Sequence, residues 1–311
     1  MLVGKEIYDN VDYVCRNFIK GGREYAFEEL HEYPYLTTFL RRLQEILAER
    51  FNTYRFLIYS KVNQFSRAGD EDIIPPYYDP HLIVFYISDE TGSIPEPLMA
   101  RCKAVFKVHL QHETEGNLFY FPLGYANGDE CDIQTVNNRA INVFFSGALN
   151  RSRVGLYKAL SGLDYIPEKL LLLTKRWLPA DLSGSFPNSN ILFTSGFASG
   201  LTQSDYNNLL YSCKIALAPH GFVNPETFRH YEAMRAGCIV VSLEMPPIRM
   251  YKNAPIIQLE SWGQLDARVT WLLKDKERLE ALQTETLMYW KDNCTEESTA
   301  RYVANTLAQL G

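Results

Sequence analysis

The chain has 311 residues, of which 46% are hydrophobic and 22% are charged, the balance of a soluble globular protein. This length suits two domains of ordinary size. The formal net charge of −6 disfavours a nucleic-acid partner, because proteins that bind DNA or RNA present a basic surface. We see no signal peptide, and no apolar run approaches the roughly 18 residues of a membrane helix, so we expect a cytoplasmic protein with no integral membrane segment.

The first part of the chain predicts helices followed by a parallel sheet. We expect an amphipathic helix over residues 6–19 and a second helix over 36–50. Runs of apolar residues then predict strands, with one short helix among them. The strands are expected at 55–60, 82–88, 104–108 and 118–122, and the helix at 95–101. Strands that are apolar throughout are typical of a parallel sheet that is covered on both faces.

A polar, turn-rich stretch at residues 124–138 separates this part from a second series of strands and helices. We therefore predict an N-terminal domain of residues 1–138 and a C-terminal domain of residues 139–311. The last helix is also a candidate to pack back on the first domain. In the second domain we expect strands at 141–145, 170–173, 191–194, 214–218 and 238–242, and helices at 151–160, 203–210, 225–236, 265–274 and 276–310.

The two series of strand and helix units predict an α/β protein with two Rossmann-like, doubly wound domains that face a central cleft. In such sheets, ligands bind beyond the carboxyl ends of the strands. The loops that follow the strands are therefore the places to look for a site.

One of these loops leads into a sharply bounded helix. A buried strand ends near Ala218, the chain turns at Gly221, and Asn224 and Pro225 suit the N-cap and the first helical position. Gly237 is expected to end the helix. The N-terminus of such a helix directs amide groups and partial positive charge toward the cleft, which suits the diphosphate of a nucleotide.

Arg229 and Glu232 lie on a similar face of this helix, three residues apart. A guanidinium can bind phosphate through two hydrogen bonds, and a carboxylate can accept hydrogen bonds from ribose hydroxyls. Alternatively, the two side chains simply pair with each other on the helix surface.

The stretch 212–241 resembles the exostosin signature of glycosyltransferase family 47. It contains an apolar strand that ends in Pro-His-Gly, then Thr-Phe-Arg-His-Tyr-Glu-Ala, then Gly-Cys-Ile and a short strand. Residues 141–153 (INVFFSGALNRSR) also resemble the strand that opens the C-terminal domain of that family. The resemblance is good over residues 141–241.

The resemblance implies a GT-B fold in which the C-terminal domain holds the nucleotide. It also implies an inverting transferase that uses a nucleotide sugar, usually UDP-linked, as co-substrate. We expect no other cofactor. On the matched segment, the donor-binding candidates are His220, Gly221, Thr227, Arg229 and Glu232. The family often has Arg where this chain has His220, which puts a phosphate contact at that position in question.

Two further patterns bear on the mechanism. Many retaining GT-B enzymes carry two glutamates eight positions apart, but the residue eight positions before Glu232 is Asn224, which favours inversion. We find no Asp-x-Asp motif at a strand end, and Asp70, Glu71 and Asp72 lie in a long loop. We therefore expect no metal site.

Without a metal, the departing diphosphate needs other positive charge. The candidates are the helix N-terminus, the turn at Gly147, and Arg151 and Arg153. The two arginines could equally be solvated residues of a first helical turn. Ser195 and Phe197 follow another strand and are candidates for nucleobase binding, unless their loop is an ordinary one.

Inverting transfer also needs a general base for the acceptor hydroxyl. Asp89 and Glu90 follow a buried strand of the first domain at its carboxyl end, so we take them as the catalytic candidates. Either one could instead be a solvated carboxylate of a turn.

We therefore expect an inverting glycosyltransferase that moves a sugar from a nucleotide donor to an oligosaccharide or other glycan acceptor. It could be a xylosyl- or hexosyltransferase of surface or capsid glycans, in the cytoplasm of a bacterium or of the host of a large virus. Two alternatives stay open: a nucleotide-sugar epimerase of GT-B type, and a non-catalytic glycan-binding module.

Overall fold

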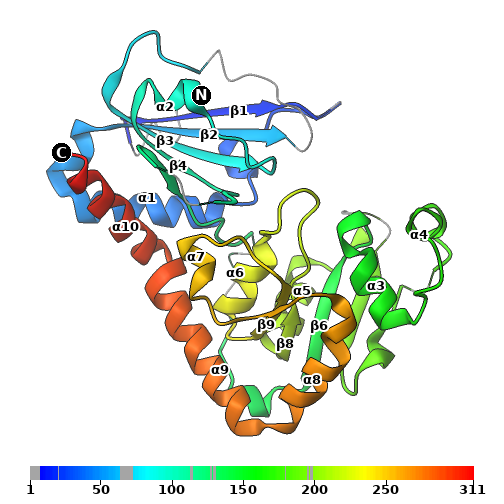
Figure 1. Ribbon diagram of the computed structural model, residues 1–311. Coiled ribbons are helices and arrows are strands. Elements are labelled where there is room, and N and C mark those ends of the chain that lie inside the picture. The colour runs from blue at the N-terminus through cyan, green and yellow to red at the C-terminus, as the bar shows by residue number, and fades with distance from the viewer. Residues whose placement is uncertain are drawn as a thin grey trace. The chain divides into compact units, whose positions relative to one another are not determined.

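The computed structural model describes residues 8–19, 21–63, 73–112, 115–126, 128, 131–178, 180–194, 196 and 199–311. The chain forms two compact units, each with its own sheet (Figure 1). The first unit consists of Met1–Ala126, Pro246–Lys252 and Asn293–Gly311, and the second of Asn127–Met245 and Asn253–Asp292. The chain thus first passes from one unit to the other after Ala126, whereas the sequence analysis places the boundary after residue 138. Among the described residues, no helix is both long and apolar enough to cross a bilayer.

The sheet of the first unit has five parallel strands that lie side by side in their order along the chain. Its central strand is buried without interruption from Leu82 to Ile87, so both of its faces need a covering layer. The strands are β1 (Val11–Asn17), β2 (Arg55–Asn63), β3 (Asp79–Asp89), β4 (Cys102–Lys107) and β5 (Leu118–Tyr120).

Helices supply a layer on each face of this sheet. On one face, Phe85 of β3 packs against Phe39 of α1, with ring centroids 5.1 Å apart. Successive strand residues point to opposite faces, and Tyr86 shares a core with Leu98 of α2 on the other one. The last helix, α10, packs along α1. The helices of the unit are α1 (Tyr33–Leu47), α2 (Glu96–Met99), α7 (Arg249–Lys252) and α10 (Glu296–Gln309).

The predicted helix at residues 6–19 is wrong for the part that the structure describes, because Val11–Asn17 is strand β1. Val11, Tyr13 and Cys15 are buried and alternate with less buried neighbours, which is the period of two that a strand requires. Parallel pairing with β2 satisfies the backbone of this segment, and a helix could not form the same ladder.

The sheet of the second unit also has five parallel strands, but their order in space is β10-β9-β8-β6-β7. The chain moves from β6 outward to β7 and then returns to form β8 on the other side of β6. The direction of winding therefore reverses between β6 and β8. The strands are β6 (Ile141–Ala148), β7 (Asn190–Thr194), β8 (Cys213–Leu217), β9 (Ile239–Leu243) and β10 (Ile256–Leu259).

Both faces of this second sheet are covered as well. Phe145 and Phe193 face a core that includes Leu156 of α3 and Val269 of α8, whereas Phe144 packs against Tyr206 of α5 on the opposite face. The helices are α3 (Val154–Ser161), α4 (Glu168–Thr174), α5 (Gln203–Tyr211), α6 (Phe228–Arg235), α8 (Leu265–Lys274) and α9 (Lys276–Tyr289).

The predicted strand at residues 170–173 is wrong, because these residues belong to helix α4. Leu171 is buried while Leu170 and Leu173 are exposed, a distribution with the period of a helix rather than of a strand. Pro167 at the N-cap starts the helix. The fifth strand, β10, is not predicted from the sequence.

Most other predicted elements are confirmed with shifts of a few residues at their ends. Two parallel, five-stranded α/β domains in one chain are the components of the GT-B fold, so the predicted fold class is confirmed. The arrangement of the two domains around a cleft stays a prediction.

Candidate active site

The reversal between β6 and β8 marks the carboxyl edge of the second sheet as the first place to look for a ligand site. In open parallel sheets, ligands bind beside the point where the strand order reverses. The loop after β6 contains Ser152, whose hydroxyl donates to the carbonyl oxygen of His220 in the loop after β8, 3.2 Å away. The two loops that the sequence analysis selects are therefore in contact.

Two guanidinium groups converge on Gly147 at the end of β6. A Cβ atom at this glycine would lie 2.5 Å from Nη2 of Arg229 and 2.9 Å from Nη1 of Arg153. Arg229 donates from Nε and Nη2 to the carbonyl oxygen of Ser146, at 3.2 and 2.8 Å, and Arg153 donates from Nη1 to that of Ala148, at 2.9 Å. Gly147 thus leaves the space that lets two positive charges approach the same point.

An aromatic ring supports both cations. The Cζ atoms of Arg229 and Arg153 lie 5.5 and 6.0 Å from the ring centroid of Phe145. Arg229 has no carboxylate within ion-pair distance among the described residues, and it does not form the surface pair with Glu232 that the sequence left open. Its charge is therefore available to an anion.

Arg151 does not take part in this arrangement. Its side chain is largely exposed and forms an ion pair with Glu168, with Nε 3.2 Å from Oε1. Of the two arginines that the sequence offers in this loop, the structure brings only Arg153 to the turn at Gly147.

Helix α6 starts later than the sequence predicts. Asn224 is not its N-cap and Pro225 is not its first residue, because the helix begins at Phe228 with Thr227 as the N-cap. The side chain of Asn224 instead accepts from the backbone N–H of Glu226, at 3.1 Å, and this local turn keeps the chain out of the helix. Gly237 ends the helix as predicted, with φ of +65°.

A buried histidine fixes the first turn of α6. Because Oγ of Ser242 donates to the carbonyl oxygen of Ala218, we assign the proton of the His230 ring to Nε2, and Nδ1 then accepts from the backbone N–H of Thr227, at 3.3 Å. Nε2 then donates to Oγ of Ser242, at 3.0 Å, and that hydroxyl donates to the carbonyl oxygen of Ala218, at 2.8 Å. Burial lowers the pKa of His230 to about 4, so the ring is neutral near pH 7.

The turn before this helix depends on a glycine. A Cβ atom at Gly221 would lie 2.7 Å from the carbonyl oxygen of Asn224, closer than real contacts allow. The preceding His220 contacts the carbonyl oxygen of Glu244 through Nε2, at 3.1 Å, and burial lowers its pKa. His220 is therefore neutral near pH 7, and it lacks the charge of the arginine that the exostosin family often has there.

Glu232 lies one turn into α6 and is buried beside Tyr206 of α5. Burial, followed by the negative charge of Glu232, raises the pKa of the Tyr206 hydroxyl well above its usual value. Glu232 thus lies close to Tyr206, and it is the carboxylate that the sequence analysis considers for ribose binding.

Ser195 and Phe197, the candidates for the nucleobase, lie outside the described residues, as do Asp70, Glu71 and Asp72. In the part of the chain that the structure describes, no three potential metal-ligating side chains form a cluster.

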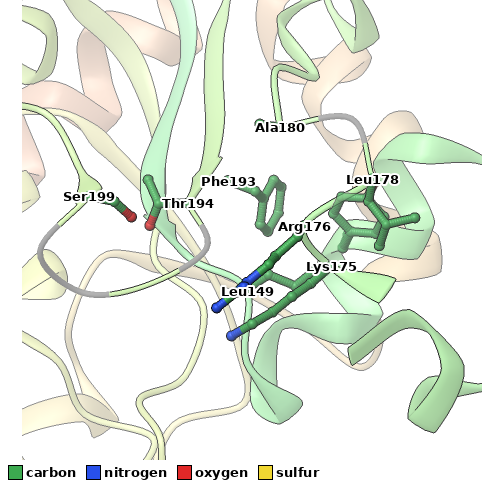
Figure 2. Close-up of a pocket in the computed structure, with 9 residues that line it drawn as sticks. Leu149, Lys175, Arg176, Leu178, Ala180, Phe193, Thr194 and Ser199 are labelled. Atoms are coloured by element: carbon green, nitrogen blue, oxygen red, sulfur yellow. The ribbon is translucent and has the colours of Figure 1, made fainter. Parts of the chain in front are cut away.

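A pocket of about 290 Å³ lies beside this edge of the second sheet, at the ends of β6 and β7. Figure 2 shows the side chains of Lys175 and Arg176 extending in parallel into it, near Phe193 and Thr194. Its full lining is Leu149, Tyr157, Lys175, Arg176, Leu178, Ala180, Phe193, Thr194 and Ser199.

In the first unit, Asp89 is completely buried at the end of β3. Its carboxylate lies 3.1 Å from Nζ of Lys107 and accepts hydrogen bonds from the hydroxyls of Thr91 and Ser93, at 2.6 and 2.9 Å. Burial alone would raise the pKa of Asp89, but Lys107 and the two hydroxyls outweigh it and lower the pKa. The geometry suits a carboxylate that stabilises the loop better than one that accepts a proton. Glu90 is half-buried in the turn that follows.

A second carboxylate at the same edge is not found by the sequence analysis. Glu32, 6% exposed, precedes α1, and its Oε1 accepts from the hydroxyl of Ser88, at 3.2 Å. The hydroxyl of Ser60 on β2 donates in turn to that of Ser88, at 3.0 Å. Burial raises the pKa of Glu32, against smaller opposing effects that include those of its own backbone N–H and of His31. A carboxylate with this shift is a stronger base than an exposed one.

The backbone around this cluster is unusual. Ser88 and His109, at the ends of β3 and β4, have φ of +64° and +58°. Left-handed backbone is costly for residues other than glycine, and it often occurs where a side chain must be held for function. Both side chains lie at the carboxyl edge of the sheet.

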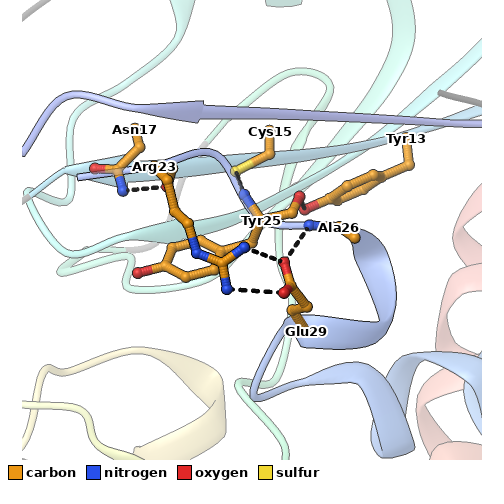
Figure 3. A network of polar contacts seen from close by, with 7 residues as sticks. All are labelled: Tyr13, Cys15, Asn17, Arg23, Tyr25, Ala26 and Glu29. Carbon is orange, nitrogen blue, oxygen red and sulfur yellow. Dashed lines mark hydrogen bonds and ion pairs between the residues drawn. The ribbon is translucent and has the colours of Figure 1, made fainter.

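Hydrogen bonds connect the loop before Glu32 to β1, as Figure 3 shows. The hydroxyl of Tyr13 donates to the carbonyl oxygen of Tyr25, at 2.9 Å, and the side-chain amide of Asn17 donates to that of Arg23, at 2.6 Å. Arg23 also forms two hydrogen bonds with Glu29, at 3.1 and 2.8 Å. These contacts define the path of the chain into α1 and so the place of Glu32.

The sequence matches no protein-family model and no curated protein with which it was compared. Among solved structures, the chain is similar to AviGT4, a glycosyltransferase involved in avilamycin A biosynthesis, with 12% identity over 96% of this chain and 97% of that chain and a TM-score of 0.49. An α-glucosyltransferase in complex with UDP and a 13-mer DNA has 10% identity over 88% and 96% of the two chains, with a TM-score of 0.44. WaaG, a glycosyltransferase involved in lipopolysaccharide biosynthesis, has 14% identity over 88% and 95%, with a TM-score of 0.42. All three TM-scores are below 0.5, and the fold class above rests on the strand order of this chain.

Proposed function

We propose that this protein is an inverting glycosyltransferase that uses a nucleotide sugar, in the first place a UDP-sugar, and a glycan acceptor. The observation that carries the proposal is the convergence of Arg153 and Arg229 on Gly147, where the winding of the second sheet reverses. Two cations held by carbonyl oxygens at a ligand-binding edge suit a diphosphate. The resemblance of residues 141–241 to the exostosin signature points to the same ligand.

The donor would bind along the edge of the second sheet. Its diphosphate would lie against Arg153, Arg229 and the first turn of α6, which is preorganised by the neutral His230. Glu232 would accept a hydrogen bond from a ribose hydroxyl, beside Tyr206. These groups would stabilise the charge that develops on the diphosphate as the bond to the sugar breaks, and we propose that they do so without a metal ion.

The acceptor hydroxyl would lose its proton to a carboxylate of the first unit. We propose Glu32 as this base, with Ser60 and Ser88 as positioning residues, and we keep Glu90 as the second candidate. Direct displacement by the deprotonated acceptor inverts the anomeric carbon. Asn224, at the position where many retaining enzymes have a glutamate, is buried and engaged in a turn, which supports inversion.

A thermal-shift screen of nucleotide sugars tests donor binding, since a ligand raises the melting temperature with its affinity and concentration. The best donor is then used in transfer assays with candidate glycans, with Arg229→Ala and Glu232→Ala as site variants. We expect both variants to lose transfer while they keep the fold. Wild-type turnover in both variants would contradict the proposal.

The same assays separate the two alternative functions. A nucleotide-sugar epimerase would convert the donor in the absence of any acceptor, and the epimerised product would identify it. A glycan-binding module would bind a glycan but release no UDP-dependent heat in calorimetry.

A further inference from the structure

Helix α4 presents an apolar surface to solvent. The side chains of Leu170, Leu173 and Trp177 are 49%, 78% and 81% exposed, and we call this set the α4 stripe. Their spacing of three and four residues places them on one side of the helix and of the turn that continues it. Single exposed apolar residues are common, but three large ones in one row mark a surface for binding.

The opposite side of α4 already has its partners. Leu171 is completely buried in the core of the second unit, and Leu172 and Leu178 pack against that core. The α4 stripe is therefore not the side of this segment that packs against the core. Figure 1 shows α4 as the outermost element of the second unit, beyond α3, so the stripe is accessible.

Three cationic residues lie in the same segment as the stripe. Residues 169–178 contain Lys169, Lys175 and Arg176 and no carboxylate, in a chain with a net charge of −6. The nearest acidic neighbour in sequence, Glu168, forms an ion pair with Arg151. Lys175 and Arg176 direct their charges into the adjacent pocket, which a headgroup phosphate could enter (Figure 2).

We propose that the α4 stripe attaches the protein to the surface of a bilayer that contains anionic lipids. Leucine and tryptophan side chains on a short helix with flanking lysine and arginine are the chemistry of interfacial binding. Trp177 lies at the headgroup level, Leu170 and Leu173 reach the acyl boundary, and the three cations pair with lipid phosphates. The concentration of cations in this one segment of an acidic chain favours an anionic lipid surface as the occupant. The inference does not depend on the proposed sugar transfer.

Sedimentation with lipid vesicles tests the attachment without any donor or acceptor. We expect the full-length protein to sediment with vesicles of phosphatidylcholine and phosphatidylglycerol, to bind pure phosphatidylcholine vesicles weakly, and to dissociate as salt is raised. The double variant Leu173→Ser with Trp177→Ser should reduce the partition coefficient by at least about tenfold, because it removes most of the exposed apolar area of the stripe. Lys175→Gln with Arg176→Gln should remove the preference for the anionic vesicles.

The matched control is Trp271→Ser, which removes a half-exposed tryptophan from α8 in the same unit and should leave binding unchanged. Equal binding by the protein and the Leu173→Ser, Trp177→Ser variant, or no binding of the protein to anionic vesicles, would overturn the proposal. A dimer in sedimentation velocity that this variant dissolves would assign the stripe to a second copy of the chain and also overturn it.

Discussion

The two sheets of this molecule have the same number of parallel strands but a different order. In the first unit the strands lie in chain order, and in the second the order reverses between β6 and β8. The reversal follows from the path of the backbone alone, and Arg153 and Arg229 lie together beside it at the end of β6. The first sheet has no such reversal. Its polar edge depends on particular side chains and on left-handed backbone at Ser88 and His109.

The difference shows two ways to gather polar side chains at the edge of one kind of sheet. The site of the second unit rests on topology, a glycine and a helix start, and its charges are permanent. The cluster of the first unit rests on a buried carboxylate, Glu32, whose charge depends on pH. The two regions should therefore respond differently to substitution and to acid.

The largest effect is expected at Glu32. Glu32→Gln keeps the size of the side chain but removes the proposed base, so we expect transfer to fall on the order of 1000-fold, with unchanged donor affinity. The variant should be at least as stable as the parent near pH 7, because it buries no charge. Rates, donor calorimetry and thermal melts provide the measurements.

Glu90→Gln is the matched comparison for that experiment. A loss of transfer in Glu90→Gln together with normal rates in Glu32→Gln would assign the base to Glu90. The contrast between a buried base in the first unit and permanent charges in the second would then be wrong.

Arg229→Ala tests the permanent charge of the second unit. We expect the dissociation constant of the donor to rise about 100-fold, because a charge-assisted bidentate contact is lost. Arg151→Ala is the matched control, since Arg151 lies in the neighbouring loop but is exposed and paired with Glu168. Calorimetry with the best donor measures the dissociation constants of both variants. Equal losses of donor affinity would show that only the net charge of the protein matters, not the position of the arginine.

Acid should change the stability of the two units in opposite directions. His230 has a folded-state pKa of about 4 against about 6.5 when unfolded, so the unfolded chain binds the extra proton between these values and stability falls as pH falls. We expect a loss on the order of 2 kcal/mol between about pH 7 and pH 4. The raised pKa of Glu32 works in the opposite direction, because there the folded state holds the proton and stability rises as pH falls.

Hydrogen exchange resolves these two effects, because it reports on each unit separately. Protection of α6 should decrease on acidification while protection of α1 does not. His230→Asn should flatten the response of α6, and an unchanged slope in this variant would exclude His230 as the cause.

A smaller effect is expected at the turn of β6. A methyl group in Gly147→Ala would displace the ends of both guanidinium groups, and we expect donor affinity to fall about tenfold with little change in the fold. Gly155→Ala is a suitable control, since its Cβ would meet only Trp262, at 3.2 Å. Identical donor affinity in Gly147→Ala and in the parent would mean that the two guanidinium groups can move to make room for the methyl group and still bind the donor.

The sequence predicts the second unit better than the first, and the reason is locality. The segment from His220 to Glu232 is continuous, so its turn, its helix and its charges can be recognised together, although the helix start is misplaced because Asn224 engages a turn of its own. The four-residue apolar run in α4 has no period that distinguishes a helix from a strand.

The cluster around Glu32 has no comparable local pattern. Its members come from three elements, with Ser60 and Ser88 separated by 28 residues and Glu32 and Ser88 by 56. The missed strand β1 also hides the one available signal, since the loop that contains Glu32 follows a strand only once Val11–Asn17 is recognised as one. The burial of a carboxylate depends on the tertiary structure, so a single sequence does not reveal it.

The approach of Arg153 and Arg229 to Gly147 has a consequence for the stability of the second unit. Two like charges within 3 Å of one point repel each other, and the carbonyl oxygens of Ser146 and Ala148 and the ring of Phe145 offset part of this repulsion. A bound dianion would offset more of it. Sulfate or phosphate should therefore protect the second unit against heat at concentrations where chloride does not.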